Sequence, residues 1–127
     1  MKKEIETRND VTLLVDSFYH KVQNDTLLEP IFNDMAKINW EIHLPKMYDF
    51  WENILFNTGS YKGNTLKMHL NLNSQYKLLT LHFERWLKLF KQTVNELFIG
   101  NNAQLAINKA DSIATVIRIK ISKQSTS

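Results

Sequence analysis

The sequence predicts an all-α fold. Of its 127 residues only 3 are Gly and 2 are Pro, which is too few for an architecture with many tight turns and favours long helices with short joints. Apolar side chains recur every three or four residues through several long segments, as on one face of a helix. No segment alternates apolar and polar residues for long enough to predict a strand. A chain of this length predicts a single domain over residues 1–127, with a real hydrophobic core.

The first helix is predicted over residues 10–25, with Asn9 or Asp10 as its N-terminal cap. Its apolar face consists of Val11, Leu14, Val15, Phe18 and Val22. Tyr19 lies on the shoulder of that face, so its ring can reach an interior cavity.

Pro30 is expected to break this first helix and to place Phe32 in a corner. A second apolar face follows, made of Trp40, Leu44, Met47, Trp51, Ile54 and Leu55. A proline in a helix interior costs ~3 kcal/mol, whereas the first turn tolerates one. We therefore expect the second helix to begin near His43 or Leu44, with Pro45 in its first turn.

The middle of the chain, residues 61–73, is its least regular part. A long helix is predicted over residues 74–98, with Gly100 ending it in the usual C-terminal position. A last helix is predicted over residues 102–122, and residues 124–127 are expected to be a frayed end. Alanines recur along this last helix and predict close approach to a neighbouring helix.

Composition excludes several classes of function. The net charge is +3, but the basic residues are scattered among acids and form no block, which argues against nucleic acid as a partner. No apolar run approaches the ~20 residues that cross a membrane, and the first residues do not have the apolar run expected of a signal peptide. The absence of Cys excludes disulfides, thiol catalysis and cysteine-based metal sites. A cytoplasmic protein is expected.

His69 is the most informative of the four histidines. Its neighbours Leu66, Met68 and Leu70 are apolar, so its ring is expected to face the interior. Taken alone, such a histidine is more often a core residue than a metal ligand. However, large side chains are unusually abundant on the predicted apolar faces and corners: Tyr19, Phe32, His43, Met47, Phe50, Trp51 and Trp86. A planar aromatic cofactor would account for that surplus.

Five motifs, in order along the chain, resemble those of a known protein family. They are residues 18–22 (FYHKV), 30–33 (PIFN), 40–52 (WEIHLPKMYDFWE), 61–69 (YKGNTLKMH) and 82–87 (HFERWL). In residue types and spacing they resemble the group III truncated haemoglobins. The resemblance extends over residues 8–120, nearly the whole chain. One departure is Thr65, where the family often has proline.

The resemblance implies a shortened globin fold, a two-over-two helical sandwich, that holds haem b without a covalent link. It implies His69 as the iron ligand, and Tyr19, His43 and Trp86 on the distal side, where a gas ligand binds. The residues implied to contact the cofactor are His69, Phe32, His43, Lys46, Met47, Phe50, Trp51, Tyr61, Leu66 and Trp86. Among these, Phe32 would pack on the porphyrin, while Lys46 or Tyr61 could meet a propionate, as could Lys62.

Without the resemblance, Tyr19 and Trp86 would be interpreted as core residues. Three alternatives stay open for His43: it gates the ligand, donates to it, or lies at the surface beside Lys46. His82 is the weaker competitor as a metal ligand and is expected to pack between helices.

The implied function is reversible binding of O2, and of NO and CO, as in oxygen transport. No dedicated catalytic residues are predicted. One alternative is a haem enzyme on the same scaffold, a nitric oxide dioxygenase or a peroxidase-like protein, with a reductase as partner. Another is a haem-free helical sensor or interaction module. A monomer or weak dimer is expected.

Overall fold

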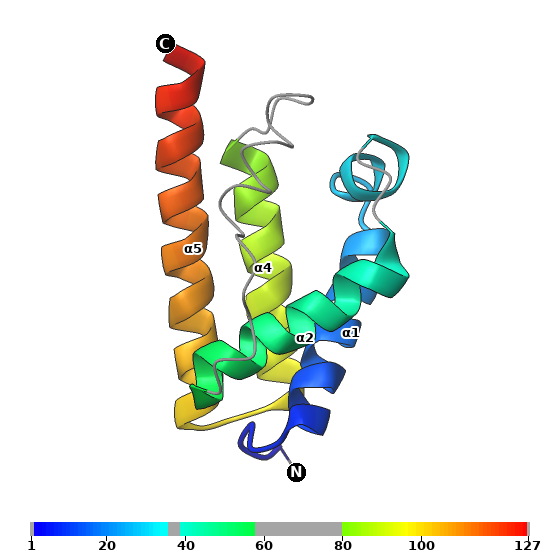
Figure 1. Ribbon diagram of the computed structural model, residues 1–127, viewed down its shortest axis with the longest axis vertical. Coiled ribbons are helices and arrows are strands. Elements are labelled where there is room, and N and C mark those ends of the chain that lie inside the picture. Colours follow the sequence, from blue (N-terminus) through cyan, green and yellow to red (C-terminus); the bar gives the residue numbers. More distant parts are fainter. Residues whose placement is uncertain (1, 36–38, 58–79, 127) are drawn as a thin grey trace.

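The structure is a computed structural model that describes residues 2–35, 39–57 and 80–126. In chain order the helical elements are α1 (Arg8–Gln23), the short π-helix η1 (Pro30–Met35), α2 (Trp40–Phe56), α4 (Thr80–Leu97) and α5 (Asn101–Thr126) (Figure 1). Across these residues, β pairing is limited to an isolated bridge between Lys3 and Phe98. The prediction of an all-α fold is confirmed.

The helices pack as two pairs. One pair is α1 with α2, and the other is α4 with α5, which run side by side in Figure 1. The pairs meet where α1 contacts α4 and where α2 contacts α5. This arrangement is the predicted two-over-two helical sandwich, and the apolar faces of the helices are buried between the pairs. Among the described helices, none is both long enough and apolar enough to cross a membrane.

The predicted apolar face of α1 is confirmed, because Val11, Leu14, Val15, Phe18 and Val22 are all buried. The prediction of its cap was wrong. Thr7 is the N-cap, and its hydroxyl accepts a hydrogen bond from the Asp10 N–H while Asp10 reaches back to the Thr7 N–H. This reciprocal capping box satisfies backbone donors that the helix leaves open, so α1 starts at Arg8.

Two expectations about proline were also wrong. The first helix ends at Gln23, well before Pro30, which instead opens η1. In α2, Pro45 lies inside the helix rather than in its first turn. The side chain of Asn39 accepts a hydrogen bond of 3.1 Å from Glu41 N–H, so α2 begins at Trp40, about one turn earlier than expected.

The N-terminal segment secures the start of α5. Ile5 is fully buried, and the Glu4 carboxylate accepts hydrogen bonds from the N–H groups of Asn101 (2.7 Å) and Asn102 (2.8 Å). A carboxylate at this position satisfies open donors and complements the helix dipole. Gly100, which precedes the helix, has a φ of 114°.

In α5 the alanines Ala103, Ala106, Ala110 and Ala114 are buried, and α5 packs on α4, which confirms the predicted close approach. The expectation of a frayed end was wrong for residues 124–126, where the helix continues to Thr126. No Gly or Pro interrupts α5 after Gly100. The predicted start of the preceding helix, at residue 74, lies outside the described residues; α4 itself begins at Thr80.

Candidate functional site

Three rings from α1 and the start of α2 meet in one cluster. The Tyr19 and His43 rings have centroids 5.3 Å apart at an interplanar angle of 83°. The Trp40 ring lies 5.3 Å from Tyr19 and 5.5 Å from His43. Both Tyr19 and His43 are buried, at 6% and 8% exposure. The alternative of a surface position for His43 is therefore wrong.

The tyrosine of this cluster keeps its proton. Burial raises the pKa of Tyr19 well above its ordinary value of 10.0, because an ionised phenolate would lose its hydration. At neutral pH the side chain is an O–H group that can donate a hydrogen bond. The cluster can therefore offer a donor to a small polar ligand in a site shielded from water.

Trp86 joins the cluster through Phe18. The Phe18 ring lies 4.8 Å from the Tyr19 ring and 5.5 Å from the Trp86 ring, in an edge contact of 86° with the latter. Trp86 also stacks on Phe90, at 5.9 Å and 9°. These contacts bring α1 and α4 together and place Trp86 against Phe18, which in turn contacts Tyr19.

The corner residue Phe32 joins the cluster through Trp40. Its ring lies 6.2 Å from that of Trp40, and its side chain is half-buried. The corner is therefore part of the same aromatic network as Tyr19 and His43.

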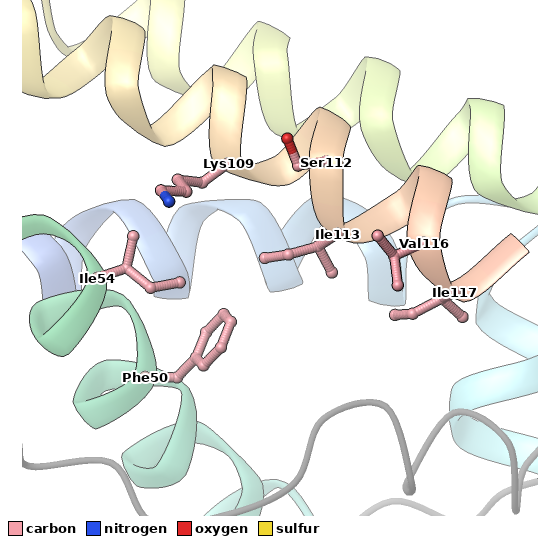
Figure 2. Close-up of a pocket in the computed structure, with 7 residues that line it drawn as sticks. All are labelled: Phe50, Ile54, Lys109, Ser112, Ile113, Val116 and Ile117. Carbon is pink, nitrogen blue, oxygen red and sulfur yellow. The ribbon is translucent and has the colours of Figure 1, made fainter. Parts of the chain in front are cut away.

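A cavity of about 360 Å³ lies between α2 and α5. Figure 2 shows the side chains of Phe50 and Ile54 pointing from α2 toward Ile113 and Ile117 on α5. The remaining lining residues are Lys109, Ser112 and Val116. The walls are therefore mostly apolar, with one cation and one hydroxyl.

One face of α2 connects the aromatic cluster with this cavity. His43, Met47, Phe50 and Ile54 follow one another at helical spacing of four, three and four residues. His43 contacts Tyr19 at one end of this face, and Phe50 and Ile54 line the cavity at the other. The aromatic cluster and the cavity therefore lie along the same face of α2.

The other predicted site residues on α2 are not among those that line the cavity. Met47 is buried in the core, and Trp51 is buried and stacks on Phe90 at 4.7 Å and 20°. Lys46 is exposed to solvent. His69, Tyr61 and Leu66 lie outside the described residues.

His82 lies in the first turn of α4 and is partly buried. Partial burial lowers its pKa below the ordinary value of 6.5, so its imidazole favours the neutral form.

Sequence reasoning missed two groups of residues around the site. Trp40 was recognised only as part of an apolar face, although its ring contacts Tyr19, His43 and Phe32. The α5 wall of the cavity was missed entirely. The spacing of Ile113, Val116 and Ile117 by three and four residues was a usable signal for a shared face, but it does not tell which helix that face meets.

Comparison with known proteins identifies the family. No family model matches the chain. The sequence is 33% identical over 118 residues to the group 3 truncated hemoglobin ctb of Campylobacter jejuni, covering 91% of each protein. The fold matches the crystal structure of a group III truncated hemoglobin from Campylobacter jejuni with a TM-score of 0.83 and 31% identity, over 95% of both chains. This chain therefore belongs to the group III truncated haemoglobins.

Proposed function

We propose that the chain binds haem b non-covalently, with His69 as the protein ligand of the iron, and that it binds O2, NO and CO reversibly. Membership of the truncated haemoglobin family supports haem as the cofactor. The observation that carries the proposal is the joining of a buried Tyr19–His43 pair and an apolar cavity along one face of α2.

The described residues fit a haem group. The cavity volume of about 360 Å³ falls within the usual range for cofactor pockets, and its lining is largely apolar, as a porphyrin requires. Phe50 and Ile54 on α2, with Ile113 and Ile117 on α5, supply the apolar surface. Phe32 at the corner contacts Trp40 on α2, and Trp86 on α4 contacts Phe18 on α1, so both add aromatic surface around the Tyr19–His43 pair.

His69 would hold the iron through a neutral imidazole nitrogen. Such a ligand is normally oriented by a hydrogen bond from its other ring nitrogen to a carboxylate, a carbonyl or water. No Asp or Glu occurs between Glu52 and Glu84, so a carbonyl partner is favoured over a local carboxylate. A carbonyl partner leaves the histidine a moderate electron donor, which suits reversible ligand binding better than peroxidase chemistry.

A haem group held by His69 would supply a ferrous iron that can bind a diatomic ligand. The side chains on the distal side would donate hydrogen bonds to that ligand and keep water away from it. The Tyr19 hydroxyl, kept protonated by burial, and the indole N–H of Trp86 can each donate to the partly negative ligand. The buried ring of His43 and the half-buried ring of Trp40 pack against Tyr19 and shield it from water.

The test is the visible spectrum of the purified protein, supplied with hemin, in its ferric, ferrous and ferrous-CO forms. We expect Soret absorption, a five-coordinate ferrous form and a CO complex. His69→Ala should abolish the five-coordinate ferrous spectrum, and added imidazole should restore it. His20→Ala, which changes an exposed histidine on α1, is the matched control and should leave every spectrum unchanged.

An unchanged spectrum in His69→Ala would contradict the assignment of the ligand. A wild-type protein that takes up no hemin would favour a haem-free sensor or interaction module instead. Steady turnover of NO with O2 and a reductase, above the rate of autoxidation, would identify a nitric oxide dioxygenase. The same comparison with peroxide would identify a peroxidase-like enzyme.

A further inference from the structure

Asp25 lies two residues after the end of α1, and its carboxylate binds both α4 and the turn that follows at residues 27 and 28. Its Oδ1 accepts a hydrogen bond of 2.6 Å from Nη1 of Arg85 on α4. Its Oδ2 accepts from the N–H groups of Leu27 and Leu28, each at 3.1 Å. The Asp25 side chain is only 10% exposed, and that of Arg85 is 38% exposed. The carboxylate is therefore held by three donors in a partly dehydrated position, where charge-assisted hydrogen bonds are strong.

From Asp25 a short series of contacts leads to Phe32. Leu28, which Asp25 holds through its N–H, is itself buried at 2% exposure. The Leu28 carbonyl accepts hydrogen bonds from Ile31 N–H at 3.1 Å and from Phe32 N–H at 3.2 Å. The position of Phe32 therefore depends on the same turn that the Asp25 carboxylate closes.

At the other end of the pair, Arg85 directly precedes Trp86 in α4. We propose that Asp25 and Arg85 form a positioning pair that holds the corner bearing Phe32 at a set distance from Trp86. The inference rests on the proposed function, because these two aromatic residues are among those assigned to the haem pocket. Neither Asp25 nor Arg85 is expected to touch the cofactor or its ligand.

The chain offers a matched control. Lys21 on α1 and Glu96 on α4 also form an ion pair, with a distance of 2.9 Å and side-chain exposures of 24% and 48%. This pair likewise ties the C-terminal region of α1 to α4, but Lys21 and Glu96 make no contact with the turn at residues 27–32 among the hydrogen bonds of the described residues. Removing it removes a tie between the helices without loosening the corner.

The experiment compares Arg85→Met with Lys21→Met, first in the haem-free protein. Amide hydrogen exchange at Phe32 and the NMR resonance of the Trp86 indole N–H report the corner and α4 directly. In Arg85→Met we expect Phe32 exchange to accelerate about tenfold, as loss of one charge-assisted hydrogen bond implies, and the indole resonance to shift. Both signals should stay at wild-type values in Lys21→Met.

Asp25→Asn separates the ion pair with Arg85 from the hydrogen bonds that the same side chain accepts from the turn at residues 27 and 28. Its amide oxygen can still accept from the Leu27 and Leu28 amides, but the ion pair is lost. Asp25→Asn and Arg85→Met should have similar effects, and the double variant should be no worse than either alone, because both remove the same interaction. Arg85→Lys keeps the charge and should restore part of the wild-type exchange rate.

In the haem-loaded protein, transfer of hemin to an acceptor globin should be about tenfold faster in Arg85→Met than in wild type and unchanged in Lys21→Met. Equal changes in Arg85→Met and Lys21→Met, or none in either, would overturn the positioning role. If wild type takes up no hemin, the proposed function fails, while the exchange and indole measurements still decide whether the pair positions the corner.

Discussion

The imidazole ring of His43 stands edge-on to the phenol ring of Tyr19, with centroids 5.3 Å apart. The two residues come from different helices, α1 and α2, which pack against each other. Trp40, one turn before His43, closes another side of the same pair. In the proposed function, this small cluster forms the distal wall where a gas ligand is held.

Replacing Tyr19 with Phe tests the distal donor. The ring and its packing are kept, but the hydroxyl is lost. If that hydroxyl donates to the ligand, O2 should dissociate roughly five- to tenfold faster, corresponding to a hydrogen bond worth ~1 kcal/mol. Stopped-flow release of O2 measures the rate. Tyr48→Phe is the control, since the Tyr48 hydroxyl donates to Asp16 instead. Unchanged or slower release in Tyr19→Phe would argue against the role.

Replacing Pro45 with Ala should stabilise the protein. Pro45 lies inside α2, is exposed, and cannot donate the hydrogen bond that a helical residue gives to the carbonyl four positions earlier. Alanine restores that bond, and we expect a gain of ~1–3 kcal/mol in the free energy of unfolding. Urea denaturation measures it, with exposed Lys46→Ala as control. A loss of stability would mean that the proline fits α2 better than its missing bond suggests.

Replacing Gly100 with Ala should destabilise the protein by ~1–3 kcal/mol. The φ of Gly100 is 114°, which L side chains rarely adopt, and an added Cβ would collide with the Glu4 carboxylate. Thermal or urea denaturation checks the loss. In a Glu4→Ala background the collision disappears and only the backbone strain remains, so the effect should be smaller. An equal effect in both backgrounds would place all of the cost in the backbone.

Asp10 should make stability dependent on pH in the acid range. Burial acts to raise the pKa of Asp10, but hydrogen bonds from Lys3 and from the N–H groups of Glu6 and Thr7 outweigh it, and the pKa is lowered. A lowered pKa stabilises the folded protein above the unfolded value of 3.8, and this stabilisation disappears as pH falls through the folded value.

Wild type should therefore be more stable than Asp10→Asn at neutral pH, and the difference should shrink below pH ~4. Urea denaturation of both proteins from neutral to acid pH measures this. A difference that does not vary with pH would assign the effect of the substitution to packing rather than to charge.

The helical faces could be predicted from the sequence because they depend on local spacing. The apolar positions of α1 are buried as expected. The boundaries were less predictable. Thr7 was missed as a cap because Asn9 and Asp10 are also good caps, although Thr7 and Asp10 have the three-residue spacing of a capping box, a local signal that could have found it.

The candidate site could be predicted in part. Tyr19, His43, Phe32 and Trp86 were selected on their residue types and on the resemblance, and the structure places them in one aromatic network. The contribution of Trp40 and the α5 wall of the cavity could not be predicted. Helical spacing shows that a face is apolar, but it does not show which other face covers it.

The sequence by itself determined the class of fold, the helix faces and, through its motifs, the family. Those features depend on residues that are near one another along the chain. Only the tertiary structure decided that Glu4 caps α5, that Asp25 pairs with Arg85, and that α5 forms the wall of the cavity opposite Phe50. These contacts join residues that are distant in sequence. A charged group can pair with any suitable donor or acceptor, and an apolar face can pack against any other apolar face. The way the helices cross therefore decides which partner each one meets.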